Sequence, residues 1–290
     1  MSKLRDIRYV RLGTRDVESA AQYAVRILGL QETGRIGNPK TGQAVYFRSD
    51  QRHHSLVYFE GDPNEQIIAF EVVDRGVLKA ILSQVQATGM ATHVGSRDEC
   101  ALRNVTAMIA FRDPSGNRIE LVVPASDSDG TFAPPRPAGI DRFAGVGLRS
   151  LDPVRDEAFW TGELGARVSD RIGVAPLLRL DDTHHRIALT PSTHCGIRHI
   201  TYQVQAFDDV MRALYFLREN GVRVIFGPGR DPTSSAIFIY FAGPDGMVFG
   251  YLTPHKLIAN ESSHRPRQFP VAPRSLCMWG SRTDMAEFSP

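Results

Sequence analysis

The chain repeats itself at a nearly constant distance, and this repetition constrains its fold more than any other feature. Residues 7–33 contain a short apolar strand, an aspartate at a helix N-cap position and an apolar-periodic helix that ends at Leu-Gly. The same series begins again at Phe143, and the two cap aspartates, Asp16 and Asp152, stand 136 residues apart. Self-similarity of this kind indicates duplicated structural units.

A second kind of unit follows each of the first units. Strands at residues 68–72 and 200–204 each precede an amphipathic helix, and a hairpin with a Pro-Ser-Gly or Pro-Asp-Gly turn completes the unit. The turn prolines, Pro114 and Pro244, are 130 residues apart. We therefore predict an α+β fold of two domains, each with paired βαβββ units whose strands curl around a central cavity.

Composition marks the boundaries between these parts. A segment rich in Pro, Gly, Ser and Asp separates the two pairs of units and is typical of a linker. We predict an N-terminal domain over residues 1–124, a linker over 125–139, a C-terminal domain with the active-site cavity over 140–255, and a polar tail over 256–290 that wraps the surface.

The charge of the chain is close to balanced, with 34 basic and 32 acidic side chains and a formal net charge of +2. This balance provides no strong field for nucleic acid or an anionic membrane, so we expect neither partner. No apolar run has the length of a signal peptide or a membrane-spanning helix, and the three distant cysteines suggest no disulfide framework. We therefore expect a cytoplasmic protein.

The tandem units resemble the vicinal oxygen chelate superfamily, which has the glyoxalase/bleomycin resistance/extradiol dioxygenase fold. Their four-unit arrangement resembles the two-domain type I extradiol dioxygenases that cleave dihydroxybiphenyl and catechol rings. The resemblance extends from about residue 5 to residue 255 and includes RHHSLVY at 52–58 and THHRIAL at 183–189, which look like the family's Arg-His-His-Ser motif. It implies a small aromatic or ring-cleavage-product ligand and a homo-oligomer.

The resemblance also implies a metal site, but this chain departs from it. Family members bind Fe(II) in the second domain through two histidines and one carboxylate, and the motifs place these positions at Gly145, His199 and Gly250. Glycine has no donor, and one imidazole cannot hold Fe(II) usefully. We therefore expect no metal and no cofactor, with Fe(II) as the alternative if His194 or Asp231 replaces a ligand. The two glycines are expected to leave open space.

Several side chains that could carry chemistry remain at positions the family uses. His185 matches an acid–base histidine, and Tyr240 matches a tyrosine that hydrogen-bonds the substrate hydroxyl. Imidazole and phenol groups suit proton transfer near neutral pH. We predict catalytic roles for His185, His199 and Tyr240. Contacts to the substrate are predicted for Gly145, Gly250, Asp231 and His184, although a structural role is also open for His184.

Three functions remain open on this basis. The preferred hypothesis is a metal-independent enzyme of aromatic-compound catabolism that performs lyase, isomerase or hydrolase chemistry on an oxygenated aromatic or a ring-cleavage product. The first alternative is an Fe(II)-dependent extradiol dioxygenase with replacement ligands. The second alternative is a non-catalytic protein that binds an aromatic ligand.

Overall fold

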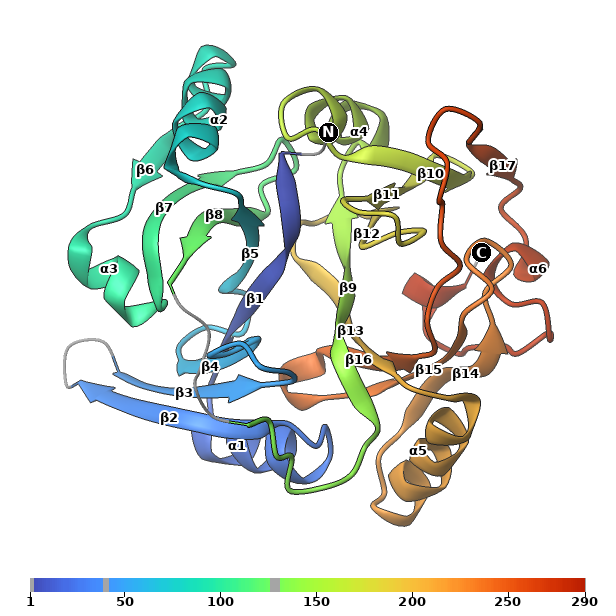
Figure 1. Ribbon diagram of the computed structural model, residues 1–290. Coiled ribbons are helices and arrows are strands. Elements are labelled where there is room, and N and C mark those ends of the chain that lie inside the picture. The colour runs from blue at the N-terminus through green and yellow to red at the C-terminus, as the bar shows by residue number, and fades with distance from the viewer. Residues whose placement is uncertain (1–2, 39–41, 126–130, 290) are drawn as a thin grey trace.

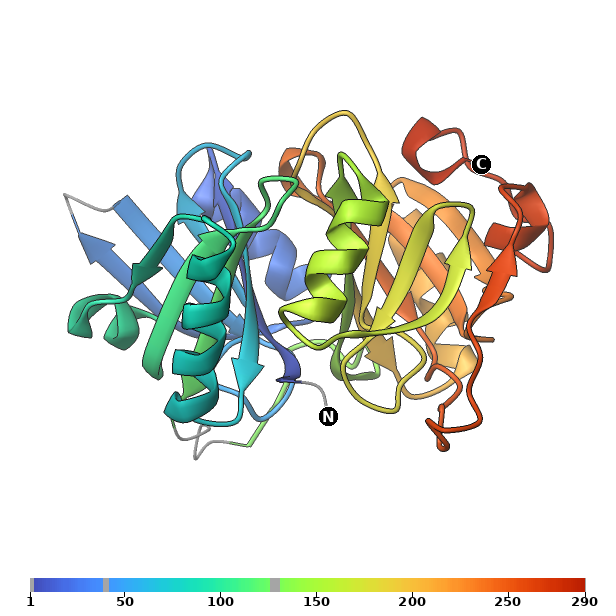
Figure 2. The ribbon, with the colours of Figure 1, turned by 90° about the horizontal axis from the view of Figure 1, so that it is seen from above.

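Two β-sheets, each curled around its own interior, form the protein (Figure 1). The computed structural model describes residues 3–38, 42–125 and 131–289. Residues 126–130 of the predicted linker lie outside the described residues. Figure 2 shows the two halves side by side, and strands β1 and β9 run next to each other at the centre of Figure 1.

The first sheet has eight strands in the order β2-β3-β4-β1-β5-β8-β7-β6. Its strands are β1 (Leu4–Thr14), β2 (Gln31–Asn38), β3 (Gly42–Arg48), β4 (Leu56–Glu60), β5 (Gln66–Val72), β6 (Thr92–Val94), β7 (Val105–Arg112) and β8 (Arg118–Pro124). The helices of this half are α1 (Val17–Arg26), α2 (Arg75–Ala87) and α3 (Arg97–Leu102).

The second sheet has nine strands in the order β17-β10-β11-β12-β9-β13-β16-β15-β14. Its strands are β9 (Ile140–Ser150), β10 (Arg167–Ile172), β11 (Ala175–Arg179), β12 (Ile187–Pro191), β13 (Ile197–Val204), β14 (Val224–Arg230), β15 (Ile237–Ala242), β16 (Val248–Leu252) and β17 (Arg267–Phe269). The helical segments of this half are α4 (Pro153–Gly162), α5 (Phe207–Glu219), η1 (Pro244–Gly246), α6 (Pro273–Leu276) and η2 (Ala286–Phe288).

The two strand orders are identical when β1 is matched with β9, apart from the added strand β17. Local signals behave alike in both halves: Asp16 caps α1 by accepting from the backbone N–H of Ser19, and Asp152 caps α4 in the same way. The predicted α+β fold of duplicated units is therefore confirmed.

Each half also covers part of the other. Tyr23 of α1 donates a hydrogen bond of 2.5 Å to the carbonyl of Ala242, which ends β15. Trp160 of α4 is fully buried and packs edge-on against Phe70 of β5, with ring centroids 5.2 Å apart. One hydrophobic core therefore spans both sheets and packs the second sheet against the first.

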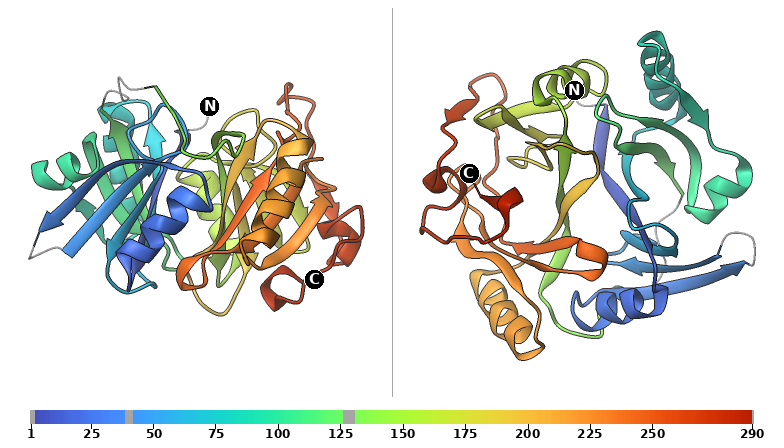
Figure 3. Two further views of the ribbon diagram at one scale, coloured as in Figure 1. Left: turned by 90° about the horizontal axis from the view of Figure 1, so that it is seen from below. Right: turned by 180° about the vertical axis from the view of Figure 1, so that it is seen from behind.

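The segment after Pro254 does more than wrap the surface, which corrects the expectation for the tail. Strand β17 extends the second sheet by pairing in parallel with β10, and Cys277 and Phe288 are buried. In Figure 3 the red end of the chain lies against the open side of this sheet. The tail lacks a periodic apolar pattern that would predict this burial. It is buried because β17 pairs with the edge strand β10, and because Cys277 and Phe288 pack against apolar residues of the second sheet. No helix in the described part of the chain is both long and apolar enough to cross a membrane.

Candidate functional site

A cavity of about 110 Å³ lies inside the second sheet. Four residues predicted from the sequence line it: His185, His199, Asp231 and Tyr240. The structure adds Arg198 and His255 to the polar wall, and Ser275, Leu276 and Phe288 of the tail close one side. Gly145, Gly250 and His184 do not line this cavity.

His199 and Tyr240 meet edge-to-face, with ring centroids 5.1 Å apart. His199 lies on β13 opposite Gly147, where an added Cβ would fall 2.4 Å from the imidazole Cε1, so this glycine makes room for the ring. Burial lowers the pKa of His199 well below its ordinary value and raises the pKa of Tyr240. Both rings are therefore neutral near pH 7.

The two glycines at the resemblance-implied ligand positions do not leave the expected open space. A Cβ on Gly145 would come within 2.8 Å of the carbonyl oxygen of Arg186. A Cβ on Gly250 would come within 2.8 Å of the Tyr240 ring, since β15 and β16 pair these two residues directly. Neighbouring backbone and side chains fill the volume that a larger residue would need. A contact of these glycines with substrate stays a prediction.

The first half shows that these two positions converge in space. Tyr9 and Glu120 correspond by the repeat to Gly145 and Gly250, and the Tyr9 hydroxyl donates a 2.6 Å hydrogen bond to the Glu120 carboxylate. Arg103 forms an ion pair with the same carboxylate at 2.7 Å. The first half thus fills this place with a satisfied ion pair.

The described residues do not supply the ligand set that Fe(II) needs. No group of three His, Cys, Asp or Glu side chains among them could hold a metal ion. His194 is exposed and lies 4.0 Å from Glu287, and Asp231 does not line the cavity as a free carboxylate because it accepts hydrogen bonds from Thr233 and Ser234. Neither suggested replacement ligand joins His199 in a set of three.

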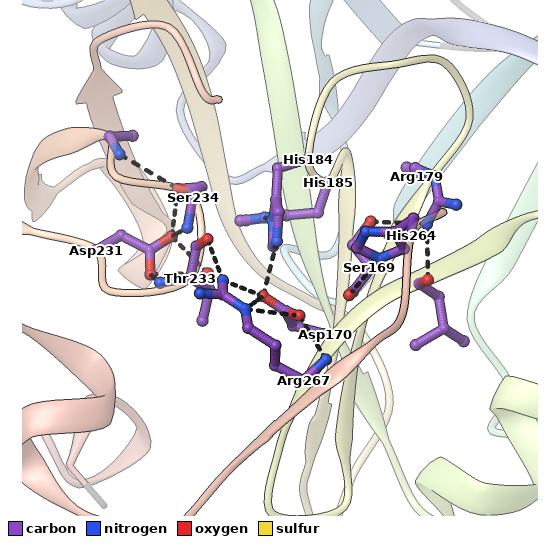
Figure 4. Close-up of polar contacts among 12 residues, drawn as sticks. Ser169, Asp170, Arg179, His184, His185, Asp231, Thr233, Ser234, His264 and Arg267 are labelled. Atoms are coloured by element: carbon purple, nitrogen blue, oxygen red, sulfur yellow. Dashed lines mark hydrogen bonds and ion pairs between the residues drawn. The ribbon is translucent and has the colours of Figure 1, made fainter. Parts of the chain in front are cut away.

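A chain of three buried groups leads to the cavity wall (Figure 4). Asp170 of β10 is fully buried and lies 2.9 Å from Nε2 of His184. Nδ1 of His184 lies 2.9 Å from Nδ1 of His185, which lines the cavity. Arg267 of β17 holds the Asp170 carboxylate from the other side, with Nη2 at 2.5 Å.

The protonation states of Asp170, His184 and His185 determine which atom donates in each hydrogen bond between them. Hydrogen bonds from His184 and Arg267 outweigh burial and hold the pKa of Asp170 below its usual range, so it is an ionised acceptor. Burial lowers the pKa of both histidines, that of His185 to about 4, so both rings are neutral. His184 must then donate from Nε2 and accept at Nδ1, and His185 must donate from Nδ1. This leaves Nε2 of His185 unprotonated, as a base requires.

The first half has the histidine pair without the carboxylate. Nδ1 of His53 lies 2.9 Å from Nδ1 of His54, as in the second half. Gly34 is the residue of the first half that corresponds to Asp170. The Leu-Gly helix ends of the two halves are 136 residues apart, and the pairing of β2 with β3 matches that of β10 with β11 at the same offset. The paired imidazoles are therefore a shared structural feature, whereas the carboxylate that orients them belongs to the second half.

Sequence reasoning missed Asp170, Arg198, His255 and Arg267. The ring of His255 lies against that of His185 in a tilted arrangement, with centroids 4.4 Å apart, although 70 positions of chain separate them. Only the adjacent histidines gave a local signal. The pair lies in the connection between β11 and β12, where His184 is oriented toward Asp170.

Comparisons with known proteins agree with this fold. An iron-dependent extradiol dioxygenase of Rhodococcus jostii is 25% identical over 280 residues, which cover 89% of this chain and 92% of that protein. The structure of a halotolerant catechol dioxygenase superposes with a TM-score of 0.85 at 22% identity, covering 99% of this chain and 97% of that one. The Mn(II)-bound glyoxalase from Novosphingobium aromaticivorans gives 0.85 at 24% identity, with 100% and 95% covered.

The name of the Rhodococcus relative supports Fe(II), the alternative cofactor, over the expectation that none is bound. That support comes from relatives, whereas the ligand positions of this chain point the other way. The family profile matches residues 6–121 and 140–251, one match for each half. The chain therefore belongs to the glyoxalase/bleomycin resistance protein/dioxygenase superfamily, and its homologues are named extradiol dioxygenases.

Proposed function

We propose that the protein is a metal-independent acid–base enzyme of aromatic-compound catabolism that acts on an oxygenated aromatic or a ring-cleavage product. The single observation that carries this proposal is the Asp170–His184–His185 chain, which ends at an imidazole that lines the cavity. The substrate class is supported by relatives named after biphenyl-2,3-diol and 3-methylcatechol. The expected cytoplasmic location and homo-oligomer belong to this proposal.

In the proposed reaction, His185 removes a proton from a substrate carbon next to a carbonyl group. The electron pair moves onto the carbonyl oxygen, and the phenolic O–H of Tyr240 donates a hydrogen bond to the oxyanion. The imidazolium formed at His185 is stabilised through His184 by the buried charge of Asp170. Return of the proton to a second carbon completes an isomerisation, and elimination of a neighbouring group gives the lyase outcome.

The remaining predicted residues have secondary parts in this scheme. His199 stays neutral and packs against Tyr240, which fixes the direction of the phenol. Asp231 lines the cavity with its carboxylate held by neighbouring hydroxyl groups, and it adds negative charge that favours the imidazolium. General acid–base catalysis of this kind contributes roughly 10²- to 10⁴-fold.

The test uses metal-free protein treated with a chelator and a panel of ring-cleavage dienones, with turnover followed by ultraviolet absorbance. Substitutions His185→Gln and Tyr240→Phe are expected to lower turnover by roughly 10²-fold or more, while chelator has no effect. Unchanged turnover in both variants contradicts the proposal. Binding of panel members without any product supports instead a non-catalytic binding protein.

An Fe(II)-dependent extradiol dioxygenase is the second candidate, and the iron-dependent Rhodococcus relative is the observation that favours it. Protein purified anaerobically with excess Fe(II) is analysed for metal and then given biphenyl-2,3-diol and oxygen. About one iron per chain, with a coloured ring-cleavage product that His199→Ala abolishes, establishes this activity. An iron content near zero per chain, together with no ring-cleavage product, rules out the dioxygenase activity.

A further inference from the structure

The guanidinium of Arg198 is a charged group of the cavity that the acid–base chemistry does not use. Its side chain lines the cavity between Thr190 and the tail. One Nη atom lies 3.3 Å from the Thr190 hydroxyl, and the other donates to the backbone carbonyl of Glu287. Its Nε is buried and has no hydrogen-bond partner within the described residues. One N–H of this planar donor is therefore unused, in a residue that lines the cavity.

No carboxylate of the described residues forms a direct ion pair with this cation. The Glu287 carboxylate is committed to Arg149, whose Nε and Nη2 lie 2.7 and 2.8 Å from its two oxygens. Asp231, the carboxylate on the cavity wall, accepts from Thr233 and Ser234 rather than from Arg198. A desolvated cation without a direct ion-pair partner is unfavourable, so the cavity is suited to an anion.

The ring of Phe288 currently covers this arginine. The Arg198 Cζ lies 4.0 Å from the centre of the ring, and Phe288 is only 3% exposed. The same ring lies 5.3 Å from that of Tyr240 and 5.8 Å from that of His199. A phenyl group thus already occupies the space beside the guanidinium and the candidate catalytic rings.

We propose that the cavity binds a small aromatic carboxylate through Arg198, and that the segment Ala286–Phe288 occupies this arginine when no such ligand is bound. This inference deepens the proposed function by naming the class of ligand for the same cavity. A carboxylate accepts two parallel N–H bonds from a guanidinium, here from Nε and one Nη. The bond that Arg198 now donates to the Glu287 carbonyl has an ionised donor only, whereas a carboxylate is also an ionised acceptor, takes two such bonds and neutralises the cation, so it replaces the carbonyl.

The size of the cavity supports the exchange of one ring for another. Its volume of about 110 Å³ is well below the roughly 300 Å³ or more that is typical of small-molecule sites. Withdrawal of the Phe288 ring releases space of the shape that a ligand's benzene ring needs. Arg149 and Arg198 bind Glu287 of the short segment Ala286–Phe288, and the Phe288 ring packs in an apolar cluster. The segment belongs to no strand, so its displacement breaks no strand pairing.

The test compares benzoate with its neutral isostere benzamide by isothermal titration calorimetry on the full chain. Benzoate is expected to bind wild-type protein about tenfold more tightly than benzamide. Arg198→Met should remove this preference, Arg198→Lys should keep part of it, and Phe288→Ala should tighten benzoate by about three- to tenfold. The matched controls Arg218→Met and Phe207→Ala, both exposed on α5, should match wild type.

Thermal melting of each variant checks that it is folded. Equal affinities for benzoate and benzamide in wild type and in Phe288→Ala overturn the inference, and so does a benzoate preference that survives Arg198→Met. The lysine variant and the Phe288 variant keep the test decisive if Arg198→Met does not fold. Failure of turnover with the preference intact rejects the proposed function alone, whereas turnover without the preference rejects this inference alone.

Discussion

Replacement of Asp170 by asparagine is predicted to reverse the hydrogen bonds of the histidine pair. The amide oxygen keeps its place next to the backbone N–H of Arg267, which lies 2.8 Å from Oδ1. The amide nitrogen then takes the position of Oδ2, where it donates to Nε2 of His184, and the half-exposed Arg267 guanidinium, which donates to Oδ2 in the wild type, turns away toward solvent. His184 must respond by donating from Nδ1, so His185 accepts at Nδ1 and carries its proton on Nε2. The group that faced the cavity as a base becomes a donor.

The expected magnitudes follow from the same contacts. The hydrogen bond between His184 and the buried carboxylate contributes about 1.5–3 kcal/mol, as is usual for a bond to a charged group. The Arg267 side chain is 47% exposed, so its ion pair adds at most about 1 kcal/mol. Asp170→Asn should therefore lower the free energy of unfolding by about 2–4 kcal/mol. A wrong tautomer at the base should lower turnover by roughly 10²- to 10⁴-fold.

Long-range ¹H–¹⁵N spectra of the imidazole rings measure the tautomers directly, and urea unfolding measures the stability. Asp182→Asn is the matched control, because Asp182 is exposed and stands two residues before His184. The reasoning is refuted if His185 Nε2 is protonated in wild-type protein. It is also refuted if the tautomers of wild type and Asp170→Asn are the same while both are folded.

Three further predictions concern stability. Burial lowers the pKa of His185 to about 4, so the stability that depends on its neutral form is lost as the pH falls from about 6.5 through 4. Urea unfolding should show that the free energy of unfolding decreases by up to about 3 kcal/mol over this range. The decrease should be smaller in His185→Gln. Burial raises the pKa of Asp113 to about 6, so its contribution is present below about pH 4 and is lost as pH rises through 6; Asp113→Asn should remove this decline of up to about 3 kcal/mol between pH 4 and 7. Gly250→Ala should cost about 1–3 kcal/mol and change the near-ultraviolet circular dichroism of Tyr240, whereas Gly162→Ala, with nothing within 4 Å of its added Cβ, should not destabilise the protein.

The duplicated fold could be predicted because its signals are local and occur twice. Each half has its own cap aspartate and its own Leu-Gly helix end, and Gly29 and Gly165 both adopt the positive φ that such an end requires. The histidine pair was visible for the same reason. These features depend on residues within a few positions of one another, so the sequence alone contains them.

The rest of the site depends on distant parts of the chain. Asp170 reaches His184 only through the register of β10 and β11, and Phe288 reaches His199 from 89 residues away. The open space expected at Gly145 and Gly250 is absent because the room around a glycine is set by its neighbours, here a carbonyl and the Tyr240 ring. No pattern at these positions could reveal that.

The two halves differ in where they carry a carboxylate, and this difference bears on the proposed function. The first half keeps a carboxylate at the metal-equivalent position, where Glu120 is neutralised by Arg103, and has Gly34 where a partner for its histidine pair would stand. The second half has the opposite arrangement, with glycine at Gly250 and a buried carboxylate at Asp170. An ionised group that is fully buried and oriented on a histidine is unfavourable unless its contacts compensate for desolvation. A buried carboxylate that orients the histidine pair beside the cavity is the arrangement on which the proposed acid–base chemistry at His185 depends.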